Sequence, residues 1–171
     1  MLTAILGLFG RRPPQLPAGP GNAPSIDEHA AALPEDLQVS LRSLGNEKGV
    51  VIDTVALAVR DYEHLREVMM GPGASTDAVD DVTMIAEAQT LLRTMIQRAP
   101  DVKTLLEIAG KRDNDRQGRA SAGDAALVLR DQGRSLHEVS SAALQWASSR
   151  SDEDMQQLQE RAATLARIAH E

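Results

Sequence analysis

The chain of 171 residues carries 18 Lys and Arg against 25 Asp and Glu, which gives a net charge of -7, and it contains no cysteine. The negative balance disfavours nucleic acid as a partner, because proteins bind phosphate backbones by releasing counterions with Lys and Arg. The lack of cysteine excludes disulfides, thiolate metal ligands and cysteine nucleophiles, and it fits a reducing compartment such as the cytoplasm.

The rest of the composition indicates helices. Phe9, Tyr62 and Trp146 are the only aromatic residues, so the core must be built from alanine, leucine, valine, isoleucine and methionine. Strong helix formers dominate and strand formers are scarce, so we expect an all-α protein. The length suits one globular domain with a short extension.

The first nine residues are largely apolar, but they are too few to span a bilayer, and Arg11 and Arg12 follow them. If these residues formed a helix, their large apolar side chains would share one face. Such a face beside two arginines is typical of an interfacial membrane anchor, and it equally suits a segment that docks on a protein. The residues predicted to contact a protein partner or a membrane are Leu2, Ile5, Leu6, Phe9, Arg11 and Arg12.

Five prolines lie between Pro13 and Pro24, interleaved with Gly19 and Gly21. A segment of this composition forms an extended tether and does not fold alone. We therefore divide the chain into an apolar tip with a Pro/Gly-rich arm over residues 1–24 and a helical domain over residues 25–171.

Prolines, glycines and capping residues divide the domain into helices. A capping-box spacing at Ser25 and Glu28 begins the first, and a break is expected at Pro100 because proline removes a backbone donor and clashes with the preceding turn. The expected helices span about residues 25–32, 34–45, 46–71, 75–99, 101–110, 121–150 and 151 to the end.

Apolar residues recur at spacings of three and four in the longer helices, which is the pattern of a buried helix face. The third helix carries the widest face, including Val55, Val59 and Tyr62. The seam expected in the fourth is Val82, Ile85, Gln89, Leu92 and Ile96. In the helices expected after residue 100, the inward residues are Leu105, Ala122, Ala126, Val128, Leu129, Leu136, Ala143, Trp146, Leu158 and Leu165. Short connections make successive helices neighbours, so we predict an antiparallel bundle of about four main helices.

The segment 113–124 resembles the twelve-residue calcium loop of EF-hands, with Gly118 at the position of the sharp turn. The resemblance implies oxygen ligands from the side chains of Asp113, Asp115, Gln117, Ser121 and Asp124 and from the carbonyl of Arg119. It names Ca²⁺ as the one candidate cofactor. The same residues also fit a solvated turn between helices, because Asp124 stands where EF-hands place a bidentate glutamate.

No other pattern points to chemistry. The histidines His29, His64, His137 and His170 lie on different expected elements without metal-ligand spacing, and no nucleophile motif is present. We therefore expect a non-enzymatic helical interaction or assembly protein, such as a scaffold, an adaptor or a structural subunit, attached through its N-terminal arm to another protein or copy. Two alternatives remain: a peripheral membrane protein anchored by residues 1–12, and a calcium-responsive helical module.

Overall fold

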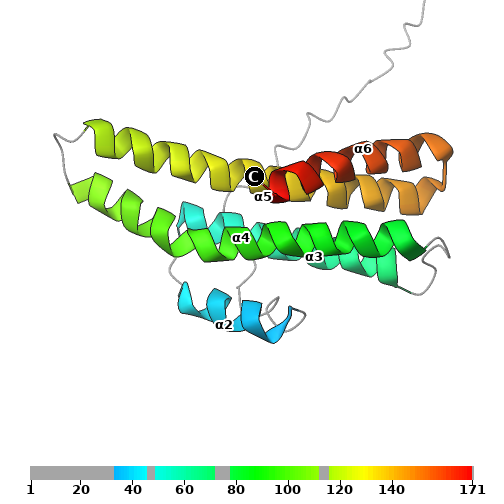
Figure 1. Cartoon of the computed structure of the whole chain (residues 1–171), viewed down its shortest axis with the longest axis horizontal. Coiled ribbons are helices and arrows are strands. Elements are labelled where there is room, and N and C mark those ends of the chain that lie inside the picture. Colours follow the sequence, from blue (N-terminus) through cyan, green and yellow to red (C-terminus); the bar gives the residue numbers. More distant parts are fainter. Residues whose placement is uncertain (1–32, 46–48, 72–77, 112–115, 171) are drawn as a thin grey trace, which may run out of the picture.

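The computed structural model describes residues 33–45, 49–71, 78–111 and 116–170 of the chain. Over these residues it contains helices and no strand, which confirms the predicted all-α class (Figure 1). The helices are α2 (Glu35–Ser43), α3 (Val50–Met70), α4 (Ala78–Lys111), α5 (Arg116–Ser149) and α6 (Asp152–Ala169). The N-terminal arm and the helix expected over residues 25–32 lie outside the described residues.

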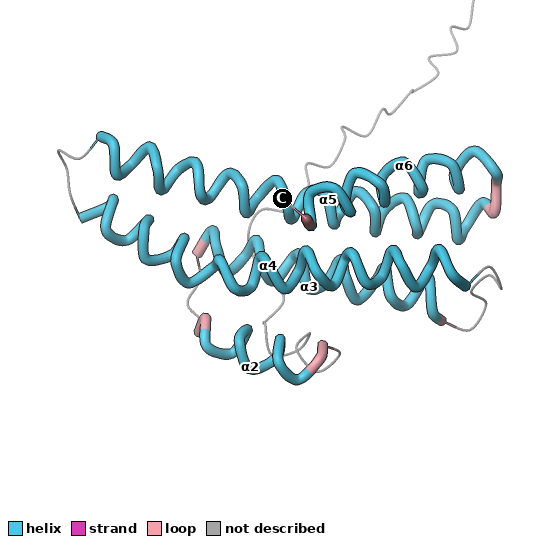
Figure 2. The backbone as a smooth tube through the Cα atoms, viewed as in Figure 1, coloured by secondary structure: helices cyan, strands magenta, loops and turns pink. Residues whose placement is uncertain are grey.

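Helices α3 to α6 alternate in direction and form the predicted antiparallel bundle. α4 and α5 pack against each other and against both α3 and α6, whereas α3 and α6, within the described part of the chain, have no contact with one another. The short α2 packs on α4 on the side of the bundle away from α6 (Figure 2). The α4–α5 hairpin is therefore the centre of the fold, with α3 and α6 as flanking helices.

The seam of α3 is buried as the periodicity predicts. Val55 is fully buried, and Val59, Tyr62, Leu65 and Met69 are at most a few per cent exposed. Burying each side chain of this size contributes about 1.5–3 kcal/mol relative to leaving it in water. The opposing faces of the other helices are buried to the same degree at Leu92, Met95, Leu136, Val139, Leu158 and Leu165.

The predicted break at Pro100 is wrong, because α4 continues through this proline as one helix of 34 residues. The residues on either side explain the continuation: Ala99 and Val102 are both buried in the bundle, so tertiary packing holds the helix across the site. The Thr104 hydroxyl donates to the Pro100 carbonyl at 2.9 Å within the following turn. Packing thus outweighs the local preference of proline.

We expect Pro100→Ala to stabilise the protein. Alanine restores the backbone N–H that proline lacks and removes the ring clash with the preceding turn, and the side chain at this position is exposed. The free energy of unfolding in urea should rise by about 1–3 kcal/mol. An unchanged or lower value would mean that the fold requires a bend at residue 100.

Other predicted boundaries and seams need correction. The long helix expected from Ser121 begins earlier, at Arg116, because the polar residues before it extend the helix instead of interrupting it. Val82, Leu105 and Val128 were predicted to face inward but are 56%, 41% and 47% exposed. The seam residue Gln89 is half-buried. Spacing alone predicted these positions. At Leu105 and Val128, α6, the helix that would cover them, has already ended.

The start of α6 carries a hydrogen-bonded cap. The Ser151 hydroxyl accepts a hydrogen bond from the Asp154 backbone N–H at 3.2 Å, as the sequence predicts for a helix that begins at this serine. The Asp154 carboxylate in turn accepts from the hydroxyls of Ser149 and Ser151 and from the Gln145 amide, the last at 2.5 Å. The hydrogen bonds from Ser149, and then from Ser151 and Gln145, hold the pKa of Asp154 below its ordinary value of 3.8.

This lowered pKa predicts a pH-dependent contribution to stability. A carboxyl group with a folded-state pKa below its unfolded value stabilises the fold above pH ~3.9, and this contribution is lost as the pH falls through the folded-state pKa. We expect Asp154→Asn to lower the melting temperature at pH 7, and we expect its difference from the wild type to disappear as the pH falls through the folded-state pKa of Asp154, where the wild-type side chain also becomes neutral. A difference in melting temperature that is independent of pH would contradict this assignment.

Candidate functional site

A buried carboxylate of α3 contacts an exposed histidine of α5. Asp61 is 5% exposed, and its Oδ2 lies 3.1 Å from Nδ1 of His137, while its Oδ1 lies 3.5 Å from a guanidinium nitrogen of Arg60. The sequence places His137 on a solvated helix surface, and its side chain is indeed 60% exposed, but the buried partner was not foreseen. The pair fixes the packing of α3 on α5, because an unpaired buried carboxylate would be costly.

One cavity lies between the start of α3 and the second half of α4. Its volume is about 340 Å³, and its lining combines Gly49, Val50, Val51, Ile52 and Leu106 with Lys103 and Glu107. Apart from Glu87, whose carboxylate lies beside His170, the buried side-chain atoms of the described chain that lack a hydrogen-bond partner belong to Arg60 and Gln132, and neither residue lines this cavity. No buried polar group is therefore available in it to recognise a ligand.

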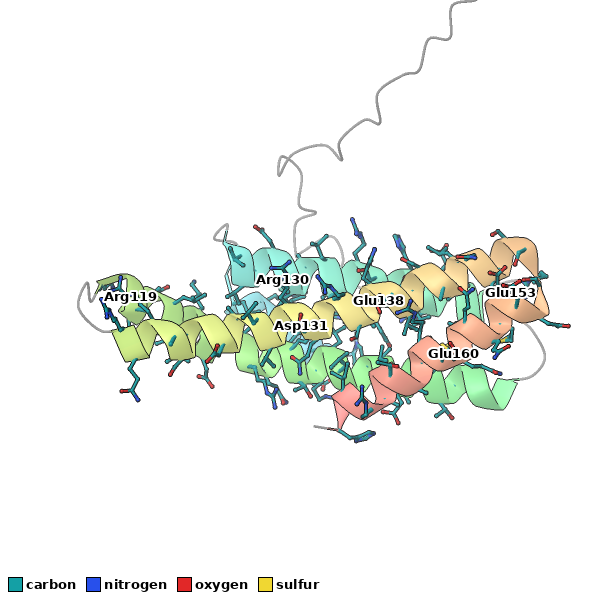
Figure 3. All side chains as sticks on the ribbon, turned by 90° about the horizontal axis from the view of Figure 1, so that it is seen from above. Arg119, Arg130, Asp131, Glu138, Glu153 and Glu160 are labelled. Carbon is teal, nitrogen blue, oxygen red and sulfur yellow. The ribbon has the colours of Figure 1, made fainter. Side chains whose placement is uncertain are left out.

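The α4–α5 hairpin projects past the flanking helices at one end of the molecule. Seen from above, α5 continues beyond both the start of α3 and the end of α6, and Arg119 lies close to the free end (Figure 3). Four large apolar side chains on this end are between 41% and 52% exposed: Leu105 and Ile108 on α4, and Leu127 and Val128 on α5. We call these four residues the open hairpin face.

On α5, this face is the continuation of the surface that α6 covers. Glu138 binds Arg161 of α6 at 2.7 Å, and Gln145 binds Asp154 of α6, so both side chains mark the side of α5 that faces α6. Leu127 lies 11 residues before Glu138 and 18 residues before Gln145, which is about three and five turns of a helix with 3.6 residues per turn. Leu127 therefore lies on the side of α5 that faces α6, and Val128 lies beside it.

The same holds on α4. The carboxylate of Glu87 lies 2.8 Å from Nε2 of His170 at the end of α6, which marks the α6-facing side of α4. Five turns of about 3.6 residues lead from Glu87 to Leu105, and Ile108 follows on the same side one turn later. The four residues thus continue the surface of α4 and α5 on which α6 packs, beyond Ala169, the last residue of that helix.

The charges beside the open hairpin face are of both signs. By the same phase count, the α6-facing side carries the carboxylates of Asp101, Asp124 and Asp131 and the guanidinium groups of Arg98, Arg116 and Arg134. All six side chains are exposed. Asp131 lies on the stretch of α5 near the end of α6 (Figure 3). The surface is therefore an apolar strip with charges of both signs along its edges.

Only part of the predicted calcium loop lies within the described residues. Gln117, Arg119, Ser121 and Asp124 lie in the first turns of α5, whereas Asp113 and Asp115 lie outside the described residues. Within residues 33–45, 49–71, 78–111 and 116–170, no three His, Asp or Glu side chains are grouped to hold a metal ion. The calcium site stays a prediction, because two of its six ligands lie outside these residues.

The six N-terminal residues predicted to contact a partner also lie outside the described residues, so the structure does not place them: Leu2, Ile5, Leu6, Phe9, Arg11 and Arg12. None of the described helices combines the length and apolar character needed to cross a membrane.

The chain matches no family model, and neither curated proteins nor solved structures give a significant match. The open hairpin face is the feature that sequence spacing predicted wrongly, since Leu105 and Val128 were assigned to the core. The signal that could have found it is the length of the helices, because α4 and α5 have 34 residues each and α6 has 18.

Proposed function

We propose that this chain is a non-enzymatic helical assembly protein, a scaffold or structural subunit whose copies associate through the open hairpin face. The single observation that carries the proposal is the position of this face. It lies on the surface that already binds one helix, α6, and it remains uncovered where that helix ends. Proteins often recognise one another when the apolar face of a helix packs into a hydrophobic groove on the partner.

The exposed area indicates what the partner must contribute. Burying a large apolar side chain completely contributes about 1.5–3 kcal/mol, so four half-exposed side chains contribute roughly 3–6 kcal/mol. Bringing two proteins together costs an estimated ~4–15 kcal/mol in lost freedom. The open hairpin face alone therefore supports at most weak association, and a stable complex requires a partner that buries comparable apolar surface of its own.

The remaining observations favour an assembly role over an enzymatic one. The cavity beside α3 offers no buried polar group to bind a substrate, and the Asp61–His137 pair lies at a helix interface without lining that cavity. Binding of nucleic acid is disfavoured by the net charge of -7. The lack of cysteine supports a cytoplasmic location.

The proposal is tested by the mass of the full chain in solution. One variant, the face variant, replaces all four residues of the open hairpin face with serine: Leu105→Ser, Ile108→Ser, Leu127→Ser and Val128→Ser. A matched control makes the same change at four apolar residues of similar exposure elsewhere: Leu57→Ser, Met70→Ser, Val82→Ser and Leu144→Ser. Circular dichroism establishes that each variant keeps its helices.

Light scattering is then recorded at protein concentrations between about 1 and 500 µM. Complexes with a binding free energy of roughly -5 to -8 kcal/mol form in this range. We expect the wild type and the control to exceed the mass of one chain, 18.4 kDa, while the face variant remains at that mass. Equal assembly of the face variant and the wild type would overturn the proposal. So would a wild type that has the mass of one chain at every concentration.

A further inference from the structure

The turn between α5 and α6 contains an arginine in an unfavourable backbone conformation. Arg150 has a φ of 52°, and it is the one non-glycine residue with a positive φ within the described residues. Side chains disfavour this region because their Cβ approaches the following carbonyl oxygen. Short connections under strain favour the exchange of an element between copies of a protein. We infer that α6 is exchanged between two copies of this chain, with the turn at Arg150 as the hinge, a mode of association beyond the proposed function.

The sequence of the turn allows α5 and α6 to continue as one helix. α5 ends at Ser149 and α6 begins at Asp152, so two residues connect them. The chain contains neither glycine nor proline after Gly133, and no residue of the turn therefore interrupts a helix. The Arg150 backbone N–H already donates to the Trp146 carbonyl at 2.7 Å, as in a continuing helix. A straight helix would remove the strain, because φ at residue 150 becomes negative.

A hydrogen-bonded cap opposes the straight helix. The Ser151 hydroxyl accepts from the Asp154 backbone N–H at 3.2 Å, a contact that exists only where a helix begins. The Asp154 carboxylate accepts from three side chains around the turn. The turn therefore balances a strained backbone against its cap, and a change in the conformational preference of residue 150 shifts this balance.

α6 can leave its bundle without opening the contacts of α3. It packs on α4 and α5, and within the described residues it has no contact with α3. The turn lies at one end of the molecule, where Glu153 marks the first turn of α6 (Figure 1 and Figure 3). A straight helix through the turn therefore carries α6 away from its own bundle. It also uncovers the surface of α4 and α5 on which α6 packs, which we call the α6-binding surface.

The occupant of the uncovered surface is α6 of a second copy. Leu158 and Leu165 are fully buried in the bundle, and a detached α6 would expose both to water. α6 of a second copy brings the same side chains to the same α6-binding surface, including Arg161 to its partner Glu138. Each copy thus regains the contacts that it gives up. The exchange is reciprocal, so the dimer is closed and has twofold symmetry.

Exchange is slow in the folded protein. α6 has to detach first, which exposes its buried leucines, and buried helices of folded domains open rarely. Unfolded chains that refold at high concentration meet the α6-binding surface of another chain before either bundle is complete. We therefore expect folded samples to keep the closed form and refolded samples to contain the exchanged dimer.

Two substitutions at one position test the inference: Arg150→Ala and Arg150→Gly. Both remove the guanidinium that lies 4.5 Å from the centroid of the Trp146 ring. Glycine favours the positive φ of the closed turn, whereas alanine favours the straight helix. All chains also carry the face variant, which removes the open hairpin face, and circular dichroism establishes that they keep their helices.

Each chain is unfolded in urea, refolded at high concentration and analysed by size exclusion with light scattering. We expect the dimer fraction to be highest with alanine at residue 150, intermediate with arginine and lowest with glycine. The dimerisation constants of the alanine and glycine variants should differ by roughly tenfold or more, because the preference counts once in each of the two chains.

A cross-link shows whether α6 is exchanged in these dimers. Glu138→Cys and Arg161→Cys replace two side chains that meet across α5 and α6 at 2.7 Å, and the chain has no other cysteine. A short bismaleimide joins the two positions within one chain in the closed form and between two chains in the exchanged dimer. Denaturing gels of the dimer peak should therefore show a species of twice the mass of one chain, 18.4 kDa.

Three results would overturn the inference. Dimers whose cross-links join positions within one chain would mean that copies associate with α6 in place. Equal dimer fractions for the alanine and glycine variants would mean that the turn is not the hinge. Refolded samples without any dimer would exclude exchange altogether. None of these results bears on the proposed function, because every chain in the experiment lacks the open hairpin face.

Discussion

Val55→Asp is expected to unfold the bundle. Val55 lies in the middle of α3 and is completely buried, so the variant loses the apolar contribution of valine and places a carboxyl group where the structure offers no solvent. The lost burial amounts to about 1.5–3 kcal/mol, and a buried polar group without a partner adds several kcal/mol more. Because domains of this size are stable by only ~5–15 kcal/mol, most of the helical circular dichroism should be lost at 25 °C.

Val50→Asp is the matched control. It introduces the same residue in the same helix, but Val50 is 71% exposed and lies in the first turn of α3, where a negative charge is favourable. We expect its unfolding free energy to stay within ~0.5 kcal/mol of the wild type. A Val55→Asp variant that unfolds cooperatively at nearly the wild-type urea concentration would show that the buried seam of α3 is assigned incorrectly.

The second large effect is expected for Leu158→Ala combined with Leu165→Ala. Both side chains are fully buried where α6 packs on α4 and α5, and each truncation should cost about 2–5 kcal/mol through lost burial and the cavity that remains. The two positions are two turns apart, ~10 Å, so their effects should add. We expect the unfolding free energy in urea, followed by the fluorescence of the buried Trp146, to fall by about 4–10 kcal/mol.

Gln157→Ala with Thr164→Ala provides the control on the exposed side of the same helix. Alanine is a good helix former, so this pair should leave the unfolding free energy within ~0.5 kcal/mol of the wild type. If both double variants had equal effects, α6 would not be seated on the bundle through its leucine seam.

The sequence was sufficient to predict most of the fold, because the signals that determine it are local. The sequence Gly71, Pro72, Gly73 predicts the end of α3, and Ser151 caps α6. The spacing of three and four residues identifies the buried seam of α3. Pro100 is the exception. Its effect depends on whether Ala99 and Val102 are held by neighbouring helices, which is a property of the tertiary structure.

The open hairpin face could not be predicted from spacing. Leu105 and Val128 lie in phase with buried residues, and their exposure depends on where α6 ends relative to α4 and α5. The partner of Asp61 was hidden for a similar reason, since His137 is 76 residues away and lies close only when α3 and α5 pack in parallel. Both features arise from the register of whole helices, which single-residue patterns do not encode.

Hydrogen–deuterium exchange of the unmodified full chain at two concentrations tests the central claim most directly. If copies associate through the open hairpin face, the amides of residues 101–111 and 116–130 exchange more slowly in the concentrated sample, because helices covered by a partner open less often. Residues 50–70 of α3 serve as the internal reference, and their exchange is expected to be the same in both samples. Equal exchange of the hairpin end at both concentrations, or slowing confined to α3, would contradict the account.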